Sequence, residues 1–470
     1  MRPVGGLAAR PPTRYTLDVR EQLGRPASAE ELAATGRKLR KQHPRSSAGT
    51  GFRTDRDPVA LLDAQNATRL QSLVPVRWGR MAQSAFAFYR GAAALMAHDL
   101  AATPVSGIHV QACGDAHLSN FGFYASPERK LVFDLNDFDE TLPAPWEWDV
   151  ERLAASLAVA ARSSGFGDEV AGRVAAHAAR AYRLGMLRLS QRSALANFHT
   201  VVSADALRQL AEQEKAHSAS KAITRAARKA EQRTSESALG KLATVTEEGE
   251  LHLVEQPPFM VRPREWPSDI AVVPQLYAES VSADIRALLR RFRPADIMLR
   301  VVGVGSVGTR CLVELLTDAT GGPLILQVKE ATASVLEPYA GTSELAHAGE
   351  RVVAGQRVMQ AVSDPFLGWT SSDGRAYYVR QFRDMKGGFE IERLSADLLE
   401  RYGRLCGSVL ARAHAQSGEP ALIAGYLGHG AAFDHAMGDF ALAYARQNDL
   451  DHAALLAAIA SGRIEARSEG

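Results

Sequence analysis

The sequence has few cysteines and no long apolar run. Only Cys113, Cys311 and Cys406 occur among its 470 residues, and they lie far apart. Such sparse cysteines exclude a disulfide framework and a four-cysteine zinc site, and they are typical of a reducing compartment. No apolar stretch approaches the ~20 residues that a membrane helix needs, and the first residues lack the apolar core of a secretory signal. We therefore expect a cytoplasmic protein with no membrane partner.

Net charge is also small. Lys and Arg number 55 against 53 Asp and Glu, which leaves a formal charge of +2. Because no basic field extends over the sequence, nucleic acid is not expected as a partner. The basic segment 221–241 is the one local exception, and it contains interleaved acidic residues. This pattern predicts a solvated amphipathic helix face, with an anion-binding segment as the alternative.

Helix and strand patterns alternate along the chain in a way that predicts an α+β fold. Helices are expected at 86–100, from Asp149 to about 242, at 343–362 and from Ala396 onward, and strands at 108–112, 121–125, 131–135, 298–302, 311–316, 324–328 and 377–382. The length suits two or three folded units. The division we expect is a disordered lead-in at 1–55, a helical unit with candidate catalytic loops at 56–255, a strand-rich unit at 256–390, and C-terminal helices at 391–470 that complete the helical unit.

The first candidate cluster is GDAHLSNFG at 114–122, directly after a predicted strand. Asp115 and Asn120 lie five positions apart. A loop with this spacing can aim a carboxylate at a substrate hydroxyl while the asparagine amide oxygen reaches a metal ion. His117 is expected to orient the loop.

The second cluster, FDLNDFDE at 133–140, places Asp134, Asp137 and Asp139 at the end of another strand. Carboxylates this close repel one another unless a cation neutralises them, and Mg²⁺ is commonly held on one or two carboxylates plus phosphate oxygens. Either cluster alone would favour a solvated polar loop. Their position on one short hairpin favours a shared site.

A glycine-rich segment lies about 190 residues later. GVGSVG contains Gly303, Gly305 and Gly308, and a strand is predicted on each side of it. A glycine loop between two strands is typical of a hairpin that covers nucleotide phosphates, whereas a dinucleotide-binding loop would lead into a helix. A plain glycine-rich hairpin is the alternative. Lys329 follows in the next strand, within reach of α/β-phosphates, with Glu350 as its first candidate anion and Glu344 as the second.

Together these segments resemble known families. GDAHLSN, a hairpin and NDFDE are similar to the catalytic and metal-binding loops of aminoglycoside-phosphotransferase-like kinases, with Asp149 of WEWDVERLA as the helix-opening aspartate. The segments FAFYRGAA, GDAHLSNFG and GERVVAGQRVMQ resemble sequences of the bacterial family of the domain of unknown function 2252, and this resemblance extends over residues 55–455. In ordinary kinases the glycine loop and lysine precede the catalytic loop, so the resemblance implies a bilobed, circularly permuted kinase-like fold, with 256–390 as the nucleotide-binding lobe.

The resemblance implies an ATP- and Mg²⁺-dependent phosphotransferase that acts on a small-molecule or protein hydroxyl. Asp115 would be the catalytic base, with His117 and Asn120 beside it. Asn120 and Asp137 would hold the metal, with Asp134 as an alternative ligand and Asp139 as a further one. Lys329, braced by Glu350, and the glycine loop would bind the nucleotide. AMP transfer and a catalytically silent ATP-binding regulator remain alternatives. A metal-dependent phosphoesterase is the weakest, because the Asn-His dipeptide of that class is missing.

Overall fold

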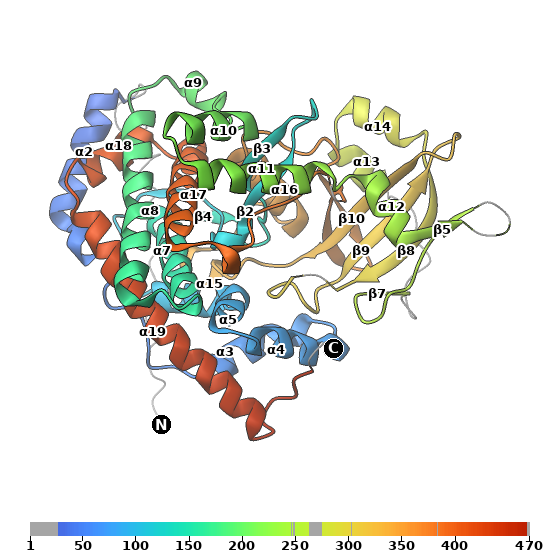
Figure 1. The fold of residues 1–470 in the computed structure, drawn as a ribbon, viewed down its shortest axis with the longest axis horizontal. Coiled ribbons are helices and arrows are strands. Elements are labelled where there is room, and N and C mark those ends of the chain that lie inside the picture. Colours follow the sequence, from blue (N-terminus) through green and yellow to red (C-terminus); the bar gives the residue numbers. More distant parts are fainter. Residues whose placement is uncertain are drawn as a thin grey trace.

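A computed structural model describes residues 27–245, 247, 250–262, 275–301, 303–382 and 384–467. Helices account for 53% and strands for 15%, so the predicted α+β class is confirmed, with helices in the majority. Most of the long helices gather on one side of the molecule, and the largest sheet lies on the other (Figure 1). Among the described residues, no helix is long and apolar enough to cross a membrane.

The largest sheet has six antiparallel strands in the order β11-β12-β10-β9-β8-β7. The strands are β7 (Met260–Val261), β8 (Arg293–Arg300), β9 (Cys311–Thr317), β10 (Pro323–Ala331), β11 (Gly368–Ser372) and β12 (Arg375–Gln381). Lys329 lies on β10, between Cys311 of β9 and Tyr378 of β12. The sequence predicted β9, β10 and β12, but of β8 it predicted only the last three residues, 298–300. It missed β7, which is only two residues long, and β11, whose Ser371 and Ser372 resemble a turn.

Five helices contribute the most residues to the main core. They are α7 (Trp146–Ser163), α8 (Gly167–Leu189), α17 (Ala396–Ser417), α18 (Pro420–Leu427) and α19 (Ala432–Ala460). The predicted apolar face of α7 is buried, but so are its charged residues Glu151 and Arg152, because neighbours surround this helix. On α17, a Cβ atom at Gly407 would lie 2.3 Å from the carbonyl oxygen of Ala178 on α8. Only glycine permits this close helix contact.

Two short antiparallel pairs support the acidic loops. Strand β1 (His109–Ala112) pairs with β4 (Leu142–Pro145), and β2 (Phe121–Ala125) pairs with β3 (Leu131–Leu135). The predicted strands 121–125 and 131–135 agree with β2 and β3 residue for residue. Beyond the hairpin ends, the Asn136 amide donates a hydrogen bond of 2.8 Å to the carbonyl oxygen of Asn120. The loops that contain the two candidate clusters are therefore directly connected.

The N-terminal part corrects one prediction. Residues 1–26 lie outside the described residues, but the expected disordered lead-in is wrong for Ala29–Gln42, which forms helix α2. Ser28 and Glu31 make a capping box at its start, and Gly36 packs against the backbone of Gly425 in α18. The composition of this segment suggested a tail, but its apolar positions Leu32 and Leu39 are buried against the core.

The chain then continues through α3 (Pro58–Ala64), α4 (Val74–Ala82), α5 (Ala85–Gly91) and α6 (Ala93–Leu100). The helix predicted at 86–100 is thus divided, because Ala92 leaves helical geometry between α5 and α6. Short 3-10 helices lie at Arg45–Ser47, Gln65–Thr68, Gln71–Leu73, Leu118–Asn120 and Ile391–Arg393.

The remaining elements surround the sheet and the hairpin. They are α9 (Ala194–Phe198), α10 (Ala204–Gln213), α11 (His217–Glu231), α12 (Ser235–Leu242), β5 (Ala243–Val245), β6 (Leu251–Leu253), α13 (Gln275–Ser280), α14 (Ala283–Leu289), α15 (Glu337–Ala340) and α16 (Ala348–Met359). Helix α16 packs on β11 and β12. Helix α11 has the predicted amphipathic form, because Ile223 and Ala227 are buried while Lys221 and Arg228 are exposed. The expected domain boundaries stay a prediction.

Candidate active site

The loop after β1 is fixed by Asp149 in the first turn of α7. The Asp149 carboxylate accepts hydrogen bonds from the amides of Cys113 (2.6 Å) and Gly114 (2.9 Å). His414 of α17 lies 3.0 Å from the same carboxylate. Gly114 has a φ of +80°, and a Cβ atom there would lie 2.4 Å from the carbonyl oxygen of Glu140. The glycine is therefore required, and the backbone of the next residue, Asp115, has one defined position.

Asp115 lies between a cation and a neutral histidine. Its Oδ1 accepts a hydrogen bond of 2.9 Å from Nε of Arg152, and Oδ2 lies 3.6 Å from Nε2 of His117. Burial lowers the pKa of His117 to about 3, so the imidazole is neutral near pH 7. The guanidinium of Arg152 packs over the Tyr89 ring, 3.9 Å from its centre. Arg152 and His117 thus hold the Asp115 side chain from two sides.

Asn120 is joined to the backbone of the same loop. Its side-chain nitrogen donates a hydrogen bond of 2.7 Å to the carbonyl oxygen of Asp115. This orientation leaves Oδ1 as the atom that the amide can present to a ligand. Asp115 and Asn120 are therefore joined within one loop, while their predicted roles stay a prediction.

The acidic loop after β3 contacts Lys329, which lies 190 positions beyond Asp139 along the chain. The Lys329 ammonium is 2.6 Å from Oδ2 of Asp139 and 3.7 Å from Oδ1 of Asp137. Tyr378 donates a hydrogen bond of 2.7 Å to Oδ1 of Asp139. Burial alone would lower the pKa of Lys329, but the two carboxylates outweigh burial and raise that pKa well above its ordinary value. The lysine is therefore charged and fixed at the acidic loop.

Asp134 and Glu350 do not have their predicted roles. Both carboxylate oxygens of Asp134 lie 2.8 Å from Nη2 of Arg412 in α17, and they also accept hydrogen bonds from two backbone amides. Asp134 is almost fully buried in this pair, which leaves it no position for a metal ion. Glu350 is not among the ion-pair partners of Lys329. Its neighbour Arg351 instead donates a hydrogen bond of 2.8 Å to the carbonyl oxygen of Asp139.

The glycine loop covers the same place. It joins β8 to β9, and the hydroxyl of its Ser306 lies 3.5 Å from Oδ2 of Asp139. Gly303 and Gly308 have φ angles of +68° and +90°. The carbonyl oxygen of Gly308 accepts a hydrogen bond of 2.8 Å from the Leu70 amide. The loop is thus folded onto the N-terminal helical region.

A cavity of about 350 Å³ lies where these parts meet. Asp115, Asp137 and Asp139 line it from the acidic loops, and Gly305, Ser306 and Thr309 line it from the glycine loop. Asn120 and Lys329 do not line the cavity but contact residues that do, namely Asp115 for Asn120 and both Asp137 and Asp139 for Lys329. Gly303 and Gly308 lie at the two ends of the glycine loop. The cavity therefore brings together most of the chemistry that the sequence placed in two distant segments.

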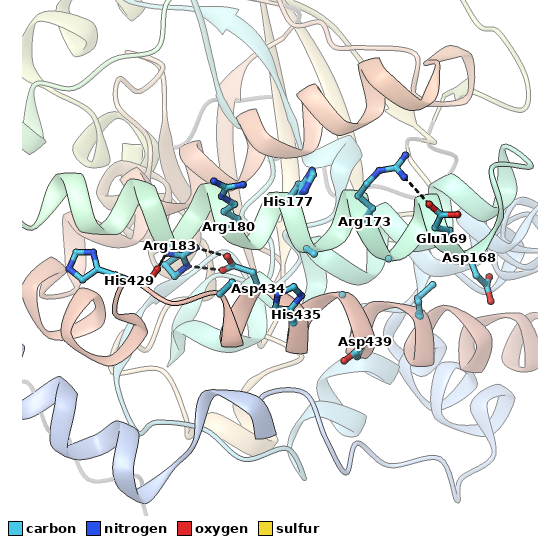
Figure 2. Close-up of a pocket in the computed structure, with 15 residues that line it drawn as sticks. Asp168, Glu169, Arg173, His177, Arg180, Arg183, His429, Asp434, His435 and Asp439 are labelled. Carbon is cyan, nitrogen blue, oxygen red and sulfur yellow. Dashed lines mark hydrogen bonds and ion pairs between the residues drawn. The ribbon is translucent and has the colours of Figure 1, made fainter.

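A larger groove of about 650 Å³ lies elsewhere, between α8 and α19 (Figure 2). None of the residues predicted from the sequence lines it. Its buried charges already neutralise each other, since Arg183 donates to both carboxylate oxygens of Asp434. Of its three histidines, His429 and His435 are exposed on the surface, and His177 is half-buried. We regard the smaller cavity as the candidate site because the reactive groups converge there.

Several residues of the site were missed by sequence reasoning. Arg69 and Arg90 line the cavity from the N-terminal helical region, and Arg152 holds Asp115. Burial raises the pKa of Glu140, also in the lining, to about 7. The positions of Arg152, one helical turn after Asp149, and of Glu140, directly after Asp139, were usable signals. Arg90 stands in the quoted segment FAFYRGAA, whereas Arg69 had no signal.

The fold and site define an α+β protein in which carboxylates, a buried lysine and a glycine loop surround one cavity. The profile of a bacterial family, described as "Uncharacterized protein conserved in bacteria (DUF2252)", matches residues 69–458. Because the match covers most of the chain, the protein belongs to this family. No curated protein and no solved structure gave a match.

Proposed function

We propose that the protein is an ATP- and Mg²⁺-dependent phosphotransferase with a bilobed, circularly permuted, protein-kinase-like fold. The observation that carries this proposal is the contact of the Lys329 ammonium with Asp139 and Asp137 at a cavity that Asp115 also lines. Kinases place a lysine on the third strand after a glycine loop, and a metal-binding aspartate and a catalytic aspartate nearby. The order β8, glycine loop, β9 and β10 with Lys329 is consistent with that arrangement.

The donor set fits Mg²⁺ that arrives with a nucleotide. Oδ1 of Asp137 is buried and accepts no hydrogen bond. Asp139 also faces the cavity, and Asn120 has an amide oxygen to offer. No three His, Cys, Asp or Glu side chains form a metal cluster within the described part of the chain. Mg²⁺ commonly uses only one or two carboxylates and completes its shell with phosphate oxygens and water.

In the proposed reaction, Asp115 accepts the proton of the acceptor hydroxyl. The acceptor oxygen forms a bond to the γ-phosphorus, the bond from that phosphorus to the β–γ bridging oxygen breaks, and ADP leaves. Arg152 keeps the Asp115 carboxylate in position. Lys329 and the backbone amides of the glycine loop bind the phosphates. When bound, Mg²⁺ would neutralise charge that develops on the phosphate oxygens, and Asp137, Asp139 and Asn120 are the residues that would hold it.

A thermal-shift screen with ATP, ADP and AMP, with and without Mg²⁺, tests binding. We expect ATP to raise the melting temperature only when Mg²⁺ is present, because the carboxylates then no longer oppose the phosphates. The mass of any product formed from a library of hydroxyl acceptors distinguishes phosphate transfer from AMP transfer. Nucleotide binding without ATP turnover would instead favour the silent regulator.

The variant Asp137→Asn tests the metal role. We expect it to abolish Mg²⁺-dependent ATP turnover and to keep a melting temperature close to that of the wild type, since Lys329 retains Asp139 as partner. Asp205→Asn is the matched control, because Asp205 is exposed on α10, away from the cavity. Unchanged turnover in Asp137→Asn would remove Asp137 from the site.

A further inference from the structure

Two arginines reach the cavity from the N-terminal helical region, which contains none of the candidate site residues predicted from the sequence. Arg69 follows the 3-10 helix Gln65–Thr68, and Arg90 lies in the last turn of α5. Both line the cavity, together with Asp115, Asp137 and Asp139. The glycine loop lies against them, because a Cβ atom at Gly305 would be 3.3 Å from the carbonyl oxygen of Arg90.

Arg90 is the less satisfied of the two arginines. Within the described ranges, its guanidinium donates no hydrogen bond and forms no ion pair, and its Nε is buried. Asp115 and Glu392 are the carboxylates that act on it through space, and burial lowers its pKa. The buried Nε atom, which has no hydrogen-bond partner, carries a desolvation cost that an anion in the cavity would lower.

Arg69 is only partly satisfied. Its Nη1 donates a hydrogen bond of 2.6 Å to the carbonyl oxygen of Val307 in the glycine loop, while its Nε is buried and unpaired. Asp139, Glu140 and Glu330 act on it through space. Arg69 thus lies between the glycine loop and these carboxylates, and its guanidinium retains N–H donors for a ligand.

A third arginine holds the other two in place. Arg77 of α4 is fully buried and donates to the side chain of Asn66 (2.7 Å) and to the carbonyl oxygen of Gly91 (3.1 Å). These acceptors lie three residues before Arg69 and one residue after Arg90. One buried side chain therefore connects two residues close in sequence to the cavity arginines, which helps to preorganise the pair.

We propose that Arg69 and Arg90 bind the terminal phosphates of a nucleoside triphosphate, on the cavity wall contributed by the N-terminal helices. This assignment rests on the proposed function and adds to it the part of the donor that these residues recognise. A planar guanidinium matches phosphate oxygens with paired hydrogen bonds. Asp115, Asp137 and Asp139 repel a polyphosphate, and Lys329 is already paired with two of them. The two arginines supply further positive charge at the cavity, and neither forms an ion pair with these carboxylates among the described residues.

Isothermal titration calorimetry of the full chain with ATP, AMP and inorganic tripolyphosphate, each with Mg²⁺, tests the assignment. We expect Arg90→Gln to lower the affinity for ATP and tripolyphosphate at least tenfold and to leave that for AMP within twofold. Arg90→Lys, which keeps the charge but not the paired geometry, should lie between. Arg228→Gln, on the exposed face of α11, is the matched control and should bind all three like the wild type. Circular dichroism checks folding, and Arg69→Gln provides the same comparison if Arg90→Gln does not fold.

The outcomes separate the two proposals. Wild-type turnover of ATP with unchanged ATP affinity in the Arg90 and Arg69 variants would overturn the arginine assignment and leave the phosphotransferase intact. Arg90-dependent binding of tripolyphosphate without any nucleotide binding would support the anion site and overturn the phosphotransferase. Absence of binding of all three probes to the wild type would overturn both.

Discussion

Replacement of Lys329 by methionine tests the contact between the two distant segments. Methionine keeps the length and apolar body of the side chain but removes the ammonium. Lys329 is only 2% exposed and neutralises Asp139 at 2.6 Å and Asp137 at 3.7 Å. Removal of one partner from a buried ion pair costs about 3–5 kcal/mol. Because both carboxylates face the cavity and keep some solvent, we expect the lower end, about 3 kcal/mol.

The double variant Lys329→Met/Asp139→Asn tests whether the lost stability comes from the contact between these two side chains. With both charges removed, the asparagine still accepts a hydrogen bond from Tyr378, so the double variant should be more stable than the sum of the single variants predicts. For residues in direct contact, we expect a coupling of at least about 1 kcal/mol. Urea unfolding followed by circular dichroism measures each corner of the cycle. Lys221→Met, on the exposed face of α11, is the matched lysine control.

Two results would refute this reasoning. A loss of less than about 1 kcal/mol in Lys329→Met would mean that the ammonium does not neutralise buried carboxylates. Additive effects in the double variant would mean that Lys329 and Asp139 are not in contact. Either result would also remove the observation on which the proposed function depends.

Two further predictions concern buried carboxylates outside the cavity. Burial raises the pKa of Glu314 to about 8 from an ordinary 4.5, so its ionisation destabilises the fold increasingly as pH rises through that window. Between pH 6 and 8 the free energy of unfolding of the wild type should therefore fall by about 2 kcal/mol more than that of Glu314→Gln. Urea titrations that show the same fall for both proteins would contradict this. Asp134→Asn breaks the buried pair with Arg412 and should lower the free energy of unfolding by about 3 kcal/mol. The variant should still show any Mg²⁺-dependent thermal shift with ATP that the wild type shows. If the folded variant lost that shift, Asp134 would be a metal ligand after all.

Local pattern was sufficient for much of the scaffold. The hairpin β2–β3 follows from two apolar runs around a turn, and its bounds agree with the prediction residue for residue. Asp115 and Asn120 could be placed in one loop, and Asp149 at the start of a helix, because loops and helix starts are short-range features of a sequence. Helix α2 shows the limit of such reasoning. Its composition resembled a tail, and its buried leucines became visible only with the helices against which they pack.

Partners distant in sequence needed the tertiary structure. Asp134 and Asp137 are three residues apart in one acidic run, and nothing in that run distinguishes them. Asp134 still lies within β3, where Arg412 of α17 reaches it, whereas Asp137 lies beyond the strand end and faces the cavity. Lys329 likewise takes Asp139 as partner, and Glu350 in α16 does not join it. The energy of a charge depends on which groups and how much water surround it.

The sequence alone determined the α+β class, the hairpin and the chemical types available for a site. Tertiary structure decided which carboxylates face the cavity, which cation neutralises them, and that Arg69 and Arg90 line the same space. The physical reason is a difference in range. Helix periodicity and turns depend on neighbours within a few residues, while ion pairing and desolvation depend on groups that only the folded chain brings within a few ångströms of each other.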